Sequence, residues 1–187
     1  MKEIRNFLGR YVALREEEWL EIASCLQEQS LPKKTCILKE NVVCDYVAFV
    51  LSGSFRYYFV KDGIEKVTGF FFAGDAVSDY SSFLSEKPSK HYIESISPSV
   101  IYKLYKRDLL KLYEKHRNVE KLGRLIAENL FLSLDNRLNS FLYLSPEQRY
   151  HELMERNPDL SQLVPQYMIA SYLGVEPETI SRIRKRK

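Results

Sequence analysis

The C-terminal stretch VPQYMIASYLGVEPETISRIRKRK, residues 164–187, has the pattern of two short helices joined by a tight turn. Such a pair needs a small residue where the helices cross and a turn residue that tolerates positive φ, and Ala170 and Gly174 supply these. The apolar residues that can hold the second helix onto the first are Ile169, Leu173, Val175, Ile180 and Ile183. Seven positions that meet seven separate demands predict a helix-turn-helix.

The second predicted helix has a polar face suited to a DNA groove. It begins at Pro177, where the missing N–H costs nothing. With Ile180 and Ile183 turned inward, the opposite face carries Glu178, Ser181, Arg182 and Lys185. Arginine can read guanine O6 and N7, and glutamate can accept a hydrogen bond from cytosine N4. The residues predicted to contact phosphates, which orient without specifying, are Gln166, Tyr167, Thr179, Arg184 and Arg186. The alternative is a solvated basic helix end that interacts with the helix dipole.

The distribution of charge supports an anionic partner for this end of the chain. The 187 residues carry 28 basic and 25 acidic side chains, a net charge of +3. Five of the last six residues are basic, and without them 23 basic and 25 acidic residues give a net charge of −2. The excess is therefore a basic tip on a slightly acidic body, and such a tip needs an anionic partner or solvent.

A strand-rich region precedes the helical half of the chain. Four of the seven glycines fall within residues 53–74, and Asp62-Gly63 is a typical hairpin turn. Pro98 marks a further turn or an edge. The expected strands are Tyr46–Leu51, Phe55–Val60, Val67–Phe72 and the two halves of Tyr92–Leu104. Residues of about 30–105 are thus predicted to form a small antiparallel barrel or double-sheet roll.

Helical spacing of apolar residues flanks this region on both sides. It covers residues 3–30 and everything from Arg107 onward. The longest predicted helix runs from about 118 to 143, with Asn118 as its N-cap. Its stripe is expected to meet a second subunit through Val119, Leu122, Ile126, Leu130 and Leu134. The alternative is that the whole helix covers its own domain. Ser145 and Gln148 then form a capping box for a helix that ends near Asn157.

These features together resemble the Crp/Fnr family of bacterial transcription regulators, especially the branch with a VPQ…IASYLG…PET(I/L)SRIRK ending. The resemblance implies an α+β fold in three parts. Residues 1–116 would form a jelly-roll-like antiparallel β-roll of the cyclic-nucleotide-binding-domain type, residues 117–143 a long dimerisation helix, and residues 144–187 a DNA-binding helix-turn-helix. The last part would be winged-helix-like with a reduced wing, because residues 146–164 read as a helix and a short loop.

Family membership further implies a homodimer on a pseudo-palindromic site in double-stranded DNA, with RNA polymerase as a further expected partner. Glu178 and Arg182 occupy the family's base-reading positions. Pro177 stands where many members have another base-reading arginine, so guanine recognition there is expected to be lost.

The cyclic-nucleotide cassette of the family is altered in FFAGDAVSDYSSFLSEKPSKHYIES, residues 71–95. The family's glycine-glutamate pair reads Ser78-Asp79, and its phosphate-clamping arginine reads Ser89 or Lys90. Lysine gives a charge but not the bidentate fork. We therefore expect an unknown small-molecule effector rather than cyclic AMP or GMP, or a pocket used only for packing. The candidate pocket residues are Gly74, Asp75, Asp79, Ser81, Ser82, Lys90 and His91.

Other functional classes find little support. Cys25, Cys36 and Cys44 are one thiolate short of an iron–sulfur cluster, and the three histidines lie far apart in sequence. We expect no metal, no cofactor and no enzymatic activity. The start of the chain has no apolar signal segment, and no run approaches the roughly 18 apolar residues of a membrane helix, so a cytoplasmic protein is expected. Two alternatives stay open: a ligand-binding sensor without DNA binding, and a cupin-like metal enzyme.

Overall fold

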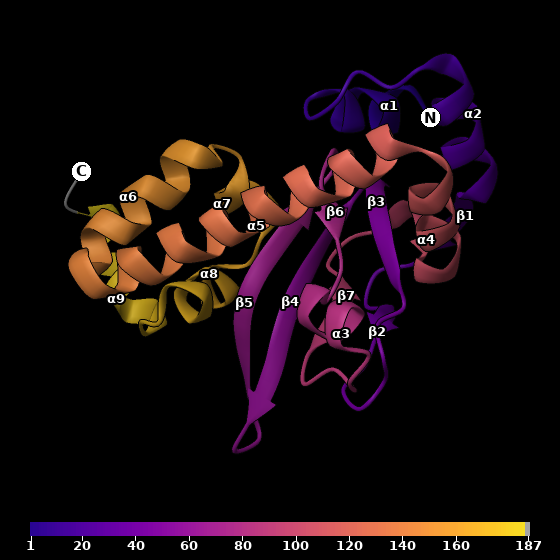
Figure 1. Ribbon diagram of the computed structural model, residues 1–187. Coiled ribbons are helices and arrows are strands. Elements are labelled where there is room, and N and C mark those ends of the chain that lie inside the picture. Colours follow the sequence, from indigo (N-terminus) through magenta and orange to yellow (C-terminus); the bar gives the residue numbers. More distant parts are fainter. Residues whose placement is uncertain (186–187) are drawn as a thin grey trace. The chain divides into compact units, whose positions relative to one another are not determined.

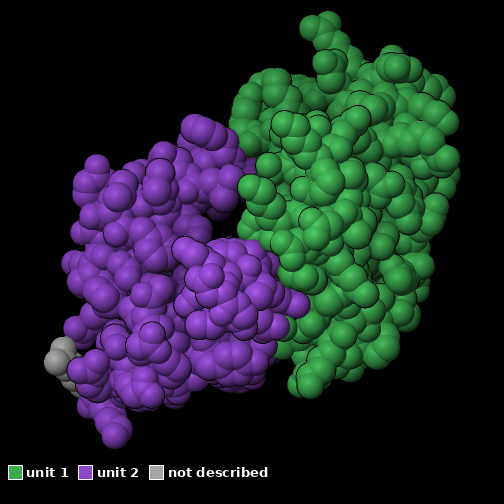
Figure 2. All heavy atoms as spheres, turned by 90° about the horizontal axis from the view of Figure 1, so that it is seen from below, with its two compact units in different colours: residues 1–57, 70–128 green, residues 58–69, 129–187 purple. Residues whose placement is uncertain are grey.

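The computed structural model describes residues 1–185, which fold into two compact units. Unit 1 comprises residues 1–57 and 70–128, and unit 2 comprises residues 58–69 and the chain from residue 129 onward (Figure 2). The boundary falls inside a single helix, α5 (Arg117–Tyr143), rather than at either of its ends. The predicted long helix is confirmed to within one residue, but the expected N-cap is wrong: α5 begins at Arg117, so Asn118 lies inside the helix, and its side chain donates to Glu18.

The helical spacing expected over residues 3–30 is confirmed only as far as Cys25. The region forms two helices, α1 (Lys2–Gly9) and α2 (Glu16–Cys25), followed by strand β1 (Gln27–Leu31). The sequence QEQSL of β1 has no strand signal of its own, and its backbone becomes a strand by pairing with β8 (Ser99–Tyr105). Tertiary pairing thus overrides local propensity at this edge.

Unit 1 is built on a β-roll of two four-stranded sheets, which confirms the predicted roll. The strand orders are β1-β8-β3-β6 and β2-β7-β4-β5. The first sheet is antiparallel at every pairing. The remaining strands are β2 (Cys36–Leu38), β3 (Tyr46–Ser52), β4 (Ser54–Lys61), β5 (Ile64–Phe72), β6 (Ala76–Val77) and β7 (Tyr92–Ser95).

Two hydrophobic clusters lie on the two faces of the first sheet. Along β3, Tyr46, Ala48 and Val50 belong to the roll core, which also contains Phe55 and Ile101. The intervening Phe49 instead packs in the helix-side core, whose buried members are Ile4, Leu8, Trp19, Ile22, Leu104, Leu112, Val119 and Leu122. This alternation is the period of two that a strand imposes. Helices α1, α2, α4 (Lys106–Lys115) and the first turns of α5 therefore cover the outer face of this sheet (Figure 1).

Gly53 makes the turn between β3 and β4, and substitution there is expected to destabilise the protein. The φ of Gly53 is +88°, and an added Cβ would lie 2.6 Å from the carbonyl oxygen of Pro98. Gly63 also has positive φ, +75°, but nothing lies within 4 Å of its added Cβ. Gly63→Ala is expected to lower the free energy of unfolding by about 1 kcal/mol through backbone strain alone. Gly53→Ala should cost roughly 1–3 kcal/mol more because it also overpacks the turn. Urea unfolding of the two variants measures this difference, and equal losses would contradict it.

Unit 2 consists of the second half of α5, four shorter helices and the tip of the β4–β5 ribbon. The helices are α6 (Pro146–Arg156), α7 (Leu160–Leu163), α8 (Gln166–Leu173) and α9 (Pro177–Lys185) (Figure 1). The predicted capping box is confirmed: the Gln148 amide donates to Ser145 Oγ, and the Ser145 amide donates to Gln148 Oε1. Between residue 106 and residue 185 the structure contains no strand, so the region where a reduced wing was expected has no wing strands at all.

Candidate functional site

The turn between α8 and α9 has the conformation that the sequence predicts. Gly174 ends α8 in the left-handed region, with φ 67° and ψ 36°. The Val175 amide donates to the carbonyl oxygen of Ala170 at 3.0 Å, which closes the helix end. An added Cβ at Gly174 would lie 3.2 Å from the Phe141 ring, so a side chain would meet both strain and a close neighbour.

Apolar residues hold the two helices together as expected. Ile169, Ala170 and Leu173 of α8 and Ile180 and Ile183 of α9 are all buried. Val175, the remaining member of the predicted set, is only half-buried. Burial of the inner positions of α9 fixes which of its side chains face outward.

The outward face of α9 carries the residues predicted to read DNA bases. Glu178, Arg182 and Lys185 of that predicted polar face are exposed, and so is Arg184, which is predicted to contact phosphate. An Arg182 guanidinium nitrogen donates to Thr179 Oγ1 at 3.2 Å, which orients the arginine along the helix. Arg186, also predicted to contact phosphate, lies outside the described residues.

Two of the predicted DNA contacts are joined to each other. The Gln166 amide nitrogen Nε2 donates to Ser181 Oγ at 2.7 Å and to the carbonyl oxygen of Pro177 at 3.0 Å. Gln166 thereby ties the first turn of α8 to the first turns of α9. Tyr167 is exposed beside it at the same end of α8.

Two arginines that the sequence reasoning missed anchor the C-terminal end of α8. Arg137 of α5 donates to the carbonyl oxygen of Tyr172 at 3.1 Å and lies over the Tyr172 ring. Arg149 of α6 donates to the carbonyl oxygen of Leu173 at 3.1 Å. Both satisfy carbonyls that a helix end leaves without partners, and both place positive charge where the helix dipole favours it. No local motif signals these contacts, because they join positions 24 and 35 residues apart.

The predicted subunit interface on α5 requires a correction. Val119 and Leu122 are only 1% and 4% exposed, because they pack in the helix-side core of unit 1. Ile126 packs against the same core, and Leu130 is half-buried. Leu134, in contrast, is 58% exposed. The other exposed apolar side chains on this second half of α5 are Phe131, Leu132, Leu138, Phe141, Leu142 and Tyr143. The apolar surface available to a partner therefore begins at about residue 131.

Asp79 is the centre of a polar cluster at the cassette position. It caps α3 (Tyr80–Ser85): its Oδ1 accepts from the Ser82 amide at 3.1 Å, and its Oδ2 accepts from Ser89 Oγ at 2.6 Å. His91 Nδ1 lies 3.8 Å from the same Oδ2, and its ring stacks on Tyr57. Burial would raise the pKa of Asp79, but the interactions with His91, Ser89 and the Ser82 amide outweigh it and hold the pKa well below its usual range.

The seven predicted pocket residues do not form one group. Asp79, Ser82 and His91 converge as described, with Ser89, which the sequence named only as an arginine replacement. Gly74 and Asp75 instead form the β5–β6 turn, in which the Phe72 amide donates to Asp75 Oδ2 at 2.7 Å. Ser81 and Lys90 are exposed. Since Asp79 is engaged with its own neighbours, its carboxylate serves the fold of this segment.

A buried arginine also occupies the second sheet, but it is paired. Arg56 on β4 contacts Glu94 on β7, with Nη2 and Oε1 3.1 Å apart, and their side chains are 7% and 17% exposed. Its charge is therefore balanced inside the protein.

The Asp79 cluster predicts a specific pH dependence. Because the folded pKa of Asp79 is lowered, its ionised form stabilises the protein above the pKa of the unfolded state, and this contribution is lost as pH falls below about 4. Asp79→Asn keeps a capping side chain and should reduce the free energy of unfolding by about 1–2 kcal/mol at pH 7, less at pH 3. Asp75→Asn is the control with the opposite sign, because burial raises the pKa of Asp75. Urea unfolding at both pH values would contradict the assignment if the two variants shared one pH trend.

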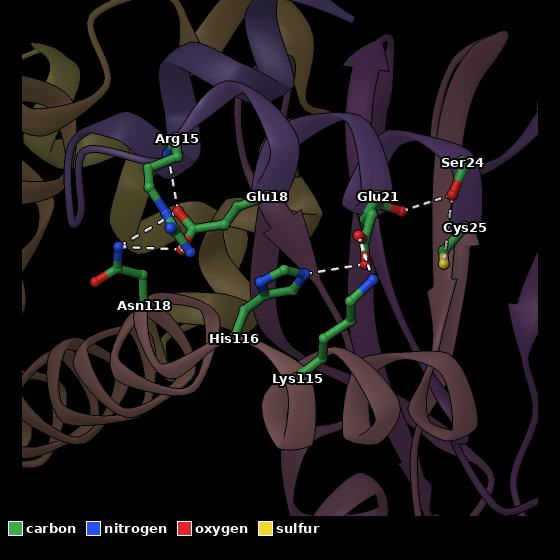
Figure 3. Close-up of polar contacts among 8 residues, drawn as sticks. All are labelled: Arg15, Glu18, Glu21, Ser24, Cys25, Lys115, His116 and Asn118. Atoms are coloured by element: carbon green, nitrogen blue, oxygen red, sulfur yellow. Dashed lines mark hydrogen bonds and ion pairs between the residues drawn. The ribbon is translucent and has the colours of Figure 1, made fainter.

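A second buried polar group joins α2 to the junction of α4 and α5 (Figure 3). Glu18 is 1% exposed and accepts hydrogen bonds from the Arg15 backbone and side chain and from Asn118 Nδ2. Burial would raise the pKa of Glu18, but these hydrogen bonds lower it on balance. Glu21 contacts Lys115 at 2.5 Å and His116 Nε2 at 2.9 Å. The sequence reasoning missed this group, whose members meet across about 100 residues of chain.

Comparisons with known proteins identify one matching family and several solved structures with a similar fold. Residues 28–116 match the family described as the cyclic nucleotide-binding domain. The structure of FixK2 from Bradyrhizobium japonicum is similar, with a TM-score of 0.72 and 22% identity over 86% of this chain and 83% of that chain. A protein from Eubacterium rectale described as a transcriptional regulator of the crp/fnr family has a TM-score of 0.70 and 19% identity, with 92% and 83% covered. The Thermus thermophilus catabolite activator protein has a TM-score of 0.58 and 22% identity, with 96% and 85% covered.

The chain thus has the fold of Crp/Fnr-type regulators, and the resemblance stated from the sequence is confirmed at that level. Residues 28–116 supply its cyclic-nucleotide-binding-type domain. No curated protein sequence matches the chain.

Within residues 1–185, no helix is long and apolar enough to cross a membrane. The same residues contain no group of three or more His, Cys, Asp or Glu side chains arranged to hold a metal ion.

Proposed function

We propose that the chain is a bacterial transcription regulator that binds double-stranded DNA sequence-specifically through α8 and α9. The observation that carries this proposal is the outward face of α9. Its inner residues Ile180 and Ile183 are buried, which leaves Glu178 and Arg182 exposed on a helix that ends in further basic residues. An exposed arginine and glutamate on a helix of this size suit hydrogen bonding to base edges in a major groove.

The regulator acts as a homodimer joined along the second half of α5. Exposed apolar residues there recur at Phe131, Leu134, Leu138 and Leu142, which lie three or four positions apart and so share one helix face. A two-fold pair of these helices would place the two copies of α9 in successive major grooves. The half-sites of a pseudo-palindromic operator would then lie about 34–36 Å apart.

The β-roll is the sensor of this regulator, and its effector is a small molecule other than cyclic AMP or GMP. Asp79 stands at the family's ribose- and phosphate-binding position and is engaged with Ser89 and the Ser82 amide. The buried Arg56 is paired with Glu94, so it does not supply the missing phosphate clamp. We assign the protein to the cytoplasm, where it would meet DNA and RNA polymerase.

Selection of bound sequences from random DNA with the full chain tests the proposal. We expect enrichment of a palindrome whose half-sites are one helical turn apart, at an affinity that falls with salt because basic residues release counterions from phosphates. Enrichment of a single half-site would contradict the homodimer. Failure to enrich any sequence would contradict DNA recognition and favour a sensor whose C-terminal unit contacts protein.

A further inference from the structure

An apolar cavity lies in unit 1 on the outer face of the first sheet. Its volume is about 60 Å³, and its walls come from α1, α2, α3, α4, the first turns of α5 and strands β3, β6 and β8. Of the fourteen residues that line it, only Tyr80 and Tyr113 carry a polar side-chain atom. The space is partly open to solvent, and because protein interiors are otherwise close-packed, it leaves an apolar lining available to a ligand.

We propose that this cavity is a binding site for a small, mainly non-polar molecule of a few heavy atoms with at most one hydrogen-bonding atom. The site is distinct from the Asp79 cluster and from the interior of the roll. Val47 and Phe49 on β3 line it, whereas Tyr46 and Ala48, their neighbours in sequence, belong to the roll core. Alternate residues of a strand point to opposite faces, so the sheet separates the two spaces.

The lining determines the class of ligand. A buried water molecule needs two to four polar partners, and apolar cavities stay dry and take up molecules such as xenon or benzene. An engineered apolar cavity of about 150 Å³ binds benzene or xenon, so this smaller space suits xenon or a short-chain molecule. The twelve lining residues without polar side-chain atoms would contact the ligand body by dispersion.

The two phenols identify the polar end of the site. Among the described residues, neither the Tyr80 nor the Tyr113 hydroxyl has a hydrogen-bond partner in the protein. Burial, the neighbouring Tyr80 and Glu120 raise the pKa of Tyr113 to about 12, so its hydroxyl remains a neutral donor. The Tyr113 hydroxyl can lie here only because residue 123 is glycine, since a Cβ at that position would overlap with the hydroxyl oxygen.

The ligand would touch α5 directly. Val119, Leu122 and Ile126 line the cavity on successive turns, at the beginning of the helix that continues into unit 2. A ligand bound in the cavity would therefore restrict the motion of the first turns of α5, whether or not the Asp79 cluster binds anything. Ligand binding at this site would not require DNA binding.

Xenon is the first probe, because it is non-polar and of suitable size. Under xenon pressure, methyl NMR signals of Ala76, Val119 and Ile126 in the full chain should shift and saturate, while those of Ala170 and Ile180 in unit 2 should not. Shifts that rise without saturation, or that appear equally in both units, would overturn the proposal.

Filling the cavity provides the matched comparison. Ala76→Leu places a larger side chain in the lining and should abolish the saturable shifts. Ala127→Leu makes the same change one residue beyond the lining and should leave them unchanged. Val119→Leu is a second, smaller filling variant in case Ala76→Leu does not fold, as checked by circular dichroism. Retained binding in a folded filling variant would overturn the site.

Propan-1-ol tests the polar end. Its hydroxyl can accept a hydrogen bond from Tyr113, whereas xenon cannot. Tyr113→Phe should weaken propan-1-ol binding at least about threefold while leaving xenon binding within twofold, since one neutral hydrogen bond contributes a modest amount. Equal effects on both probes would overturn the role given to the phenols.

Discussion

Replacing both Leu134 and Leu138 by glutamate is expected to convert the homodimer into monomers. Each leucine is 58% exposed in the single chain, so the fold should tolerate the change. In the proposed dimer both side chains are buried in each protomer, and each burial contributes about 1.5–3 kcal/mol. Losing four such contacts and burying four carboxylates should raise the dimer dissociation constant by three orders of magnitude or more, roughly.

Sedimentation equilibrium measures this dissociation constant directly. Leu20→Glu is the matched control, because Leu20 on α2 is also 58% exposed but lies in unit 1 and outside the proposed interface. It should leave the dimer intact. A Leu134→Glu/Leu138→Glu variant that dimerises as tightly as the parent chain would place the subunit interface elsewhere.

The correction at Val119 and Leu122 shows what helical periodicity can and cannot predict. The spacing of apolar residues gave the position of α5 and the fact that one face is buried. The spacing could not tell whether the same chain or a second subunit covers that face, because residues in a domain core and residues in a subunit interface recur with the same period. Leu134 and Val119 follow one predicted stripe, yet the first is exposed and the second is in the helix-side core.

Features fixed by local chemistry were predicted well. Gly174 in the left-handed region, the Ser145–Gln148 capping box and the turn at Asp62-Gly63 each depend on a few adjacent residues. Features fixed by distant pairing were not. Strand β1 forms by pairing with β8, about 70 residues away, Ser89 reaches Asp79 from beyond α3, and Asn118 reaches Glu18 from 100 residues further along the chain. Sequence spacing carries no record of such contacts.

The candidate DNA-binding surface could be predicted only in part from the sequence. The sequence placed Glu178 and Arg182 on an outward face, because two buried isoleucines fix the rotation of α9. It did not show that Gln166 holds Ser181, since that bond depends on the packing of α8 against α9. Gln166 is therefore also a candidate for positioning the recognition helix.

Replacing Arg182 by alanine is expected to weaken binding to specific DNA sites by about 1–3 kcal/mol, which is roughly 5- to 150-fold, and to relax sequence choice at one base pair of each half-site. The side chain is exposed and is oriented by Thr179 Oγ1, so its loss should not disturb the fold. Parallel selections from random DNA with the parent and variant chains measure both the affinity and the preference.

Two matched variants separate base reading from simple charge. Arg182→Lys keeps the positive charge but loses the planar fork, so it should retain non-specific affinity and lose most of the discrimination. Lys185→Ala should lower affinity for all sequences alike and reduce the salt slope by about one, as expected for a phosphate contact. If Arg182→Lys preserved the sequence preference while Lys185→Ala abolished it, recognition would depend on the charge near the end of α9 rather than on the arginine fork, and the assignment of Arg182 as the base-reading residue would fail.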